Sequence, residues 1–90
     1  MTPLEERNLV WNLVELVILK HGFKIDSEFL DPTAEDEIVF GNFFSGHPMS
    51  FEADLPEFVA EISRKLPSDY IICKDYILDT GSAIIGITKI

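Results

Sequence analysis

The sequence has little cysteine, few basic residues and no long apolar run. Cys73 is the only cysteine among 90 residues, so no internal disulfide can form, and no Asn-x-Ser/Thr glycosylation acceptor is present. Both absences disfavour secretion, and we expect a cytoplasmic protein with no basic targeting segment at its acidic start. The most apolar stretch, residues 9–19, is interrupted by Asn12 and Glu15 and is shorter than the roughly 20 residues that cross a bilayer. We therefore expect no membrane span.

The scarcity of basic residues limits the choice of partner. The chain has 7 Lys plus Arg against 16 Asp plus Glu, which gives a formal net charge of -9. Phosphate backbones and anionic lipid headgroups repel such a chain, so we expect no direct nucleic-acid binding and no membrane binding. A protein partner with a basic surface fits this charge better.

Motifs that carry catalysis or hold a cofactor are missing as well. His21 and His47 have no Cys or His at metal-ligand spacing, so we expect no metal site. Cys73 falls inside an apolar strand pattern, which predicts a core thiol and not a nucleophile. Glycine-rich phosphate loops and Ser-His-Asp patterns are absent too. The sequence predicts a non-enzymatic protein with no cofactor.

One short motif does resemble an enzyme signature. Asp79-Thr80-Gly81-Ser82 follows an apolar strand pattern and resembles the active-site signature of aspartic proteases, in which two aspartates share one proton. That family requires a flap and further strands after the motif, and too few residues follow Ser82 to supply them. The same four residue types favour a hairpin turn, which is the structure that we predict here.

Local signals predict the first half of the chain as a helix followed by a hairpin. Thr2, Pro3 and Glu5 have the order of a helix start, and Gly22 marks the helix end. Residues 23–30 alternate, which predicts a strand with Phe23, Ile25 and Phe29 on one side and Lys24, Asp26 and Glu28 on the other. A polar turn at 31–36 leads into a second strand at 37–44, and residues 49–53 are predicted as a short third strand.

The second half reads as another helix and two strands. Asp54 and Glu57 have capping-box spacing, and one apolar face continues to Pro67, so a helix is predicted from Asp54 to that proline. Strands are predicted at 70–78 and 83–90. The fold class is therefore α+β in a single domain (1–90), with two helices packed on an antiparallel sheet of four or five strands in the order α-β-β-(β)-α-β-β. The first strands of the two predicted hairpins match weakly when the sequence is shifted by 47 positions. An internal α-β-β repeat explains this match, and so does chance, because alternating strands resemble one another.

The distribution of charge and aromatics is the most informative feature. Residues 25–63 contain ten acids and no Lys or Arg, and all seven phenylalanines fall within 23–58. The adjacent Phe43 and Phe44 must point to opposite faces of a strand. We predict that the acidic hairpin and these aromatics contact a partner; the residues are Asp26, Glu28, Asp31, Glu35, Asp36, Glu37, Phe43 and Phe44.

Two functional hypotheses follow. The first is a non-catalytic inhibitor or decoy that covers a basic, nucleic-acid-binding surface of a partner protein, as phage anti-defence and nuclease-immunity proteins do. The alternative is a homodimeric structural or regulatory domain that binds a small ligand. In the first helix the polar stripe of Asn8, Asn12 and Glu15 is narrow. We predict that a homodimer, or the groove of a partner, covers at least one apolar rim of this stripe, with Trp11 as the anchor; the rims are Leu4, Trp11, Leu9 and Leu16. The alternative to this contact is that the strands curl around the helix and bury both rims within one chain. A third interpretation is that the acidic residues form a solvated face whose only role is to keep the protein soluble.

Overall fold

The computed structural model describes residues 2–32, 38–46 and 48–90. Its elements alternate as two α-β-β units, which confirms the α+β class. The helices and strands are α1 (Pro3–Lys20), β1 (Lys24–Pro32), β2 (Ile38–Ser45), α2 (Pro48–Lys65), β3 (Tyr70–Ile77) and β4 (Ala83–Lys89).

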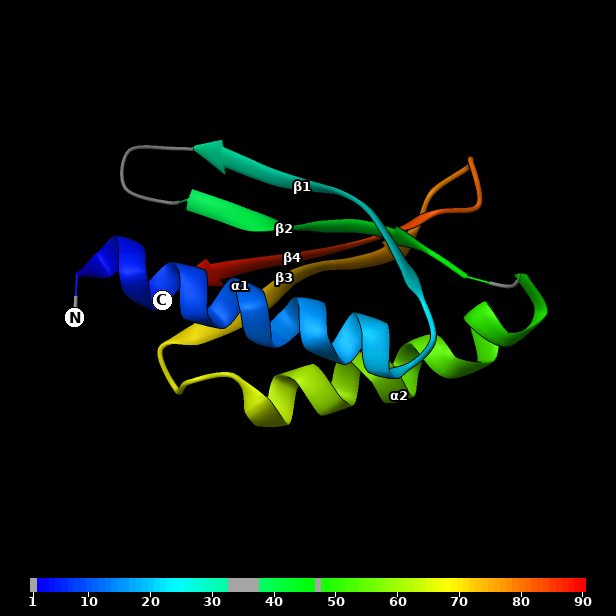
Figure 1. The fold of residues 1–90 in the computed structure, drawn as a ribbon, viewed down its shortest axis with the longest axis horizontal. Helices are drawn as coiled ribbons and strands as arrows, with labels where there is room; N and C mark the ends of the chain where they lie inside the picture. Colours follow the sequence, from blue (N-terminus) through cyan, green and yellow to red (C-terminus); the bar gives the residue numbers. More distant parts are fainter. Residues whose placement is uncertain (1, 33–37, 47) are drawn as a thin grey trace.

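The four strands form one antiparallel sheet in the order β1-β2-β4-β3. Each unit contributes one hairpin, and the two hairpins meet at the central β2–β4 pair, where Gly41 lies opposite Gly86. Figure 1 shows α1 and α2 together on one side of this sheet. The result is a two-layer architecture in which helices cover one face of the sheet.

The prediction of a third strand at residues 49–53 is wrong. This segment forms the start of α2, which begins at Pro48 and not at Asp54. Proline is favoured at the first position of a helix because its backbone has no N–H that would need a partner and its φ is already helical. The helix also continues through Pro56, so the capping pattern at Asp54 and Glu57 lies inside the helix.

The first helix begins and ends as the sequence predicts. Thr2 Oγ1 accepts a hydrogen bond from the Glu5 backbone N–H at 3.2 Å. At the other end Gly22 has a left-handed φ of 82°. The Gly22 N–H donates to the Leu19 carbonyl at 3.0 Å, and the Phe23 N–H donates to the Ile18 carbonyl at 3.2 Å. This pair of bonds is a Schellman motif, which turns the chain from α1 into β1.

Each hairpin contains a β-bulge at the equivalent place. In β1 the register shifts between Ile25 and Ser27, and in β3 it shifts between Ile72 and Lys74. The extra residues are Asp26 and Cys73, which are 47 positions apart, and both helices are 18 residues long. The α-β-β order thus repeats in three dimensions with matching irregularities.

The bulges correct two predictions from the sequence. Because one extra residue reverses the side-chain alternation, Phe29 points to the face opposite Ile25, not to the same face. Cys73 occupies the extra position of the β3 bulge and is exposed, so it is not a core thiol. A prediction that continues the two-residue alternation past a bulge assigns every later side chain to the wrong face of the sheet.

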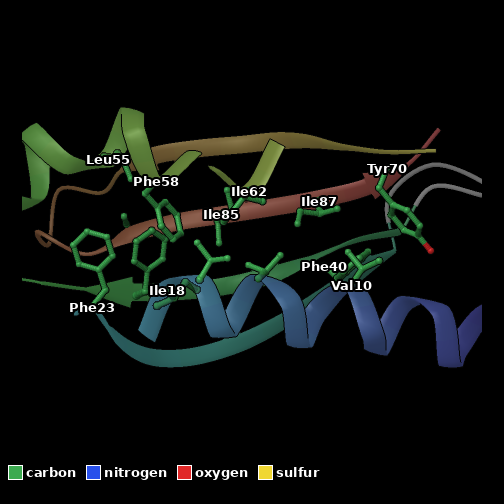
Figure 2. Packing of buried hydrophobic residues seen from close by; sticks show 14 residues of the cluster. Val10, Ile18, Phe23, Phe40, Leu55, Phe58, Ile62, Tyr70, Ile85 and Ile87 are labelled. Atoms are coloured by element: carbon green, nitrogen blue, oxygen red, sulfur yellow. The ribbon is translucent and has the colours of Figure 1, made fainter. Parts of the chain in front are cut away.

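The core lies between the helices and the inner face of the sheet. Figure 2 shows Phe23, Phe58 and Leu55 at one end of this core and Phe40, Tyr70 and Val10 at the other. The ring centroids of Phe44 and Phe58 lie 5.0 Å apart, and those of Phe23 and Phe58 lie 5.6 Å apart. These aromatic contacts hold the α1–β1 connection, the end of β2 and α2 together.

Candidate functional site: the open face of the sheet

The face of the sheet opposite the helices is the first candidate site, and we call it the open face. On β2 and β4, alternate residues such as Phe40 and Ile85 belong to the core, so the residues between them point to the other side. The strand registers extend this face across all four strands. The open face includes Ser27, Phe29, Asp31, Val39, Gly41, Phe43, Ile71, Lys74, Tyr76, Ile84, Gly86 and Thr88.

Aromatic and aliphatic side chains dominate the centre of the open face. The rings of Phe29 and Phe43 lie 5.3 Å apart, and both side chains are half-buried. Val39 and Ile84 beside them are almost fully buried, at 7% and 5% exposed, so the partly exposed rings of Phe29 and Phe43 are the apolar surface at this centre. Among the described residues no helix packs on this face (Figure 1). A partly exposed aromatic pair on a sheet face that no described helix covers is typical of an interaction surface.

The structure separates the two adjacent phenylalanines. Phe44 is fully buried, and its ring contacts Phe23 and Phe58 in the core. Its place among the predicted contact residues is therefore corrected, because its side chain does not reach the surface. Phe43 points to the open face, where Phe29 contacts it. The sequence indicated that the two rings diverge but not which of them is exposed.

The predicted acidic hairpin is only partly described. Glu35, Asp36 and Glu37 lie outside the described residues. Asp26, Glu28 and Asp31 are exposed along edge strand β1, and none of them forms an ion pair with a described base. We call these three residues the acidic edge.

The acidic edge does not face in one direction. Asp31 lies opposite Val39 on the open face, whereas Glu28 lies opposite Asn42 on the helix side. Asp26, at the bulge, accepts hydrogen bonds from Ser45 at 3.2 Å and Ser82 at 3.4 Å. The edge therefore presents negative charge around the rim of β1, and Asp31 lies on the same face as the Phe29–Phe43 pair.

Glu28 forms a small polar cluster with α1. A hydrogen bond with Glu15 raises the pKa of Glu28 above its usual 4.5, and burial and the Glu15 charge raise it further. Glu15 also accepts a hydrogen bond from Asn42 Nδ2 at 2.9 Å. Asn42 is fully buried, and its Oδ1 has no partner among the described residues. In the described part of the chain, no group of three His, Cys, Asp or Glu residues could hold a metal ion.

The residues predicted to form the apolar rims of α1 differ in exposure. Leu4, Leu9 and Leu16 are 55%, 55% and 68% exposed. Trp11 instead packs on Phe40 of its own chain at 5.5 Å, and its indole N–H donates to the Gly41 carbonyl at 3.1 Å. The exposed side of α1 thus carries several leucines, whereas Trp11 packs against the sheet of its own chain and donates a hydrogen bond to it.

The signature-like segment 79–82 forms a hairpin turn, as predicted. The Gly81 N–H donates to the Leu78 carbonyl at 3.0 Å, and Gly81 has a left-handed φ of 89°. Asp79 is exposed between β3 and β4. Glycine at this position allows the tight connection, so the motif has a structural explanation.

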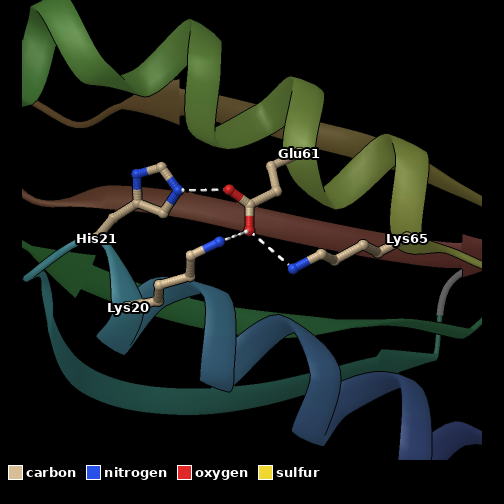
Figure 3. Close-up of polar contacts among 4 residues, drawn as sticks. All are labelled: Lys20, His21, Glu61 and Lys65. Carbon is tan, nitrogen blue, oxygen red and sulfur yellow. Dashed lines mark hydrogen bonds and ion pairs between the residues drawn. The ribbon is translucent and has the colours of Figure 1, made fainter.

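A separate charged cluster joins the two helices (Figure 3). Glu61 of α2 contacts Lys20 Nζ at 3.0 Å, His21 Nε2 at 3.0 Å and Lys65 Nζ at 2.9 Å, and its side chain is only 12% exposed. Contacts with Lys65, His21 and Lys20 lower the pKa of Glu61 from its usual 4.5 to about 2. The cluster fixes the end of α1 against α2, which is a structural role.

This pKa shift predicts acid sensitivity of the fold. Because the folded state lowers the pKa of Glu61, the contribution of Glu61 to stability is complete above pH 4.5 and is lost as the pH falls towards 2. We expect Glu61→Gln to be less stable than wild type at pH 6, with the difference disappearing by about pH 2. Urea unfolding at several pH values measures this. The exposed Glu57→Gln on the same helix is the control, and an equal loss in both variants would contradict the prediction.

Within the described ranges no helix is both long and apolar enough to cross a membrane. Comparison with models of protein families, with curated proteins and with solved structures finds no match to this chain. The sequence did not indicate Phe29 or Arg7 as site residues.

Proposed function

We propose that this protein is a non-catalytic protein-binding module that docks its open face on a basic surface of a partner. The observation that carries the proposal is the Phe29–Phe43 pair, which lies on a helix-free sheet face beside the acidic edge. Aromatic side chains at the centre of a contact supply most of its binding energy, and rim charges steer the encounter.

The charge distribution supports a basic partner. Three of the five lysines pair with carboxylates, Lys20 and Lys65 with Glu61 and Lys89 with Glu6 and Asp69. Lys24 and Lys74 have no ion pair with a described residue, and Lys74 lies on the open face, so the negative charge of the docking surface comes from the acidic edge and not from the centre of the face. The acidic edge has no such partner among the described bases, so its negative charge remains available to another molecule. With a net charge of -9 over the whole chain, long-range attraction favours a cationic surface.

The class of partner follows from the same charge. Strongly basic protein surfaces are commonly those that bind nucleic acid, because they neutralise phosphates. A module that covers such a surface competes with nucleic acid for it. We therefore propose an inhibitor or decoy that mimics negative charge without catalysing a reaction.

A homodimer through α1 is the second candidate. Leu9 and Leu16 lie two turns apart on the exposed side of α1, and Leu19 near them is 56% exposed. Their exposure favours an apolar contact between two copies of α1. Such a contact would not weaken with salt, whereas the proposed docking of the acidic edge would.

Substitutions on the two surfaces distinguish these functions. The protein is immobilised on a support and incubated with lysate of the organism that encodes it. The proteins that it captures are identified at low and at high salt concentration. We expect a basic partner that a DNA or RNA oligonucleotide displaces. Phe43→Ala should weaken its binding about 30-fold, as loss of an interface hot spot does. Asp31→Lys should slow its association roughly tenfold at low salt.

Matched controls lie on the helices. Leu16→Ala removes an exposed apolar side chain from α1, and Glu57→Lys reverses an exposed charge on α2; both should leave capture unchanged. The docking proposal would be refuted if Phe43→Ala and Asp31→Lys captured the partner as well as wild type does. It would also be refuted if no captured protein dissociated at high salt. A dimeric mass in sedimentation equilibrium that Leu16→Glu abolishes would favour the second candidate.

A further inference from the structure

A cavity of about 200 Å³ lies at the end of the core opposite the Phe23–Phe58 contact. The start of α1, the starts of β2 and β3 and the end of β4 surround it. Figure 2 shows Phe40 and Tyr70, which form part of its wall, close together at this end of the core. The described residues that line it are Pro3, Arg7, Ile38, Phe40, Tyr70 and Lys89.

The charge of this lining is opposite to that of the chain. Acids outnumber bases by 16 to 7 in the sequence, yet among the described residues Arg7 and Lys89 line the cavity and no carboxylate does. The N-terminus of α1, where Pro3 lies, adds the positive end of the helix dipole. Lys89 is balanced by Glu6 at 3.3 Å and Asp69 at 3.5 Å. Of the two positive charges that line the cavity, that of Arg7 therefore has no carboxylate beside it among the described residues.

Arg7 is partly buried and has no ion pair or hydrogen bond with any other described residue. Its Nε atom is buried and lacks a hydrogen-bond partner in the described part of the chain. Removal of a guanidinium from water costs free energy unless an anion or acceptor replaces the water. An arginine in this state beside a cavity is typical of a site for an anionic ligand.

We propose that the cavity binds a small organic carboxylate with a compact apolar body. Arg7 balances the carboxylate, because a planar guanidinium matches the geometry of two carboxylate oxygens. Ile38, Phe40 and Tyr70 contact the apolar body. Burial and a hydrogen bond with Glu6 raise the pKa of Tyr70, so its hydroxyl stays neutral and adds no negative charge to the cavity. Pockets for drug-sized ligands measure roughly 300–1,000 Å³, so a cavity of about 200 Å³ fits an acid of about ten non-hydrogen atoms or fewer.

Benzoate is the probe that tests this site, and benzamide is its neutral counterpart of the same shape. In ¹H–¹⁵N NMR titrations of the full chain, we expect benzoate to bind with a dissociation constant of about 1 mM. The Arg7 Nε–H signal and the amides of Ile38 and Tyr70 should shift together and saturate. Benzamide should not saturate the site at the same concentrations, because it has no charge to balance that of Arg7.

Variants identify the group that binds the carboxylate. Arg7→Gln should weaken benzoate binding at least about tenfold, because a hydrogen bond to a charged group is lost. Arg7→Lys should recover part of the affinity, because it retains the charge without the planar fork. Arg64→Gln removes the other arginine of the chain, which is exposed on α2, and should bind benzoate like wild type. Circular dichroism shows whether each variant is folded.

Three results would overturn the proposal. The first is the absence of saturable shifts in the wild-type protein up to 10-fold above the expected dissociation constant of about 1 mM. The second is inorganic phosphate binding as tightly as benzoate, since the apolar walls would then contribute no selectivity. The third is equal affinity of benzoate for wild type and for a folded Arg7→Gln variant.

Discussion

Gly41→Ala is expected to destabilise the protein by about 3 kcal/mol or more, because the new methyl group would overlap backbone that cannot move. A Cβ atom built on Gly41 collides with the Ile85 carbonyl oxygen and lies 2.9 Å from the Ile85 carbonyl carbon. Both atoms belong to β4, the central neighbour of β2. Relief of the collision would separate the strands that join the two α-β-β units.

Gly22→Ala is the matched control for this substitution. Gly22 has a left-handed φ of 82°, and a Cβ atom built on it meets no other atom within 4 Å. Only the backbone penalty of about 1 kcal/mol then applies. Urea unfolding followed by far-ultraviolet circular dichroism measures both losses. If Gly41→Ala is no less stable than Gly22→Ala, the close approach of β2 and β4 is wrong.

The sequence indicated α1 well because its signals are local. Thr2, Pro3 and Gly22 act within one turn of each helix end, so no distant residue decides where the helix starts or stops. The turn at 79–82 was predictable for the same reason. The start of α2 was not, because Asp54 and Pro48 both precede apolar helical spacing and both are good starting residues.

The faces of the edge strands could not be predicted from alternation alone. Asp26 and Cys73 are extra residues only in relation to the neighbouring strands, and the sequence of one strand does not show how its neighbour pairs. This is why Phe29 was assigned to the same face as Ile25 and why Cys73 was predicted to be buried. The Phe29–Phe43 pair of the candidate site depends on the same bulge, so only the paired sheet reveals it.

The acidic character of the candidate site was visible in the sequence, whereas its geometry was not. The sequence has no Lys or Arg between residues 25 and 63, and this absence holds in any fold. The distribution of Asp31 and Glu28 over two faces depends on strand register. Likewise, apolar spacing could not show that Trp11 donates a hydrogen bond to the backbone of its own sheet, 30 residues away in the chain.

Phe58→Ala is expected to cost about 3–5 kcal/mol, since it empties the centre of the aromatic end of the core. The side chain of Phe58 is fully buried and contacts Phe44 at 5.0 Å, Phe23 at 5.6 Å and His21 at 5.5 Å between ring centroids. These neighbours come from β2, the α1–β1 connection and the end of α1, so the ring joins parts of both α-β-β units. A loss of this size is a large share of the roughly 5–15 kcal/mol that stabilises a typical domain.

The open-face substitution Phe43→Ala provides the comparison for Phe58→Ala. Phe43 is half-buried and, among the described residues, has one close ring neighbour, Phe29, so its removal should lower the unfolding free energy by about 1–2 kcal/mol. Phe58→Ala should also weaken the Glu61 cluster, because His21 contacts both the Phe58 ring and Glu61 Oε1. Its loss should therefore be smaller when measured in the Glu61→Gln background. Equal losses for Phe58→Ala and Phe43→Ala in urea unfolding would mean that the two faces of the sheet are covered alike, and the open face would then be no docking surface.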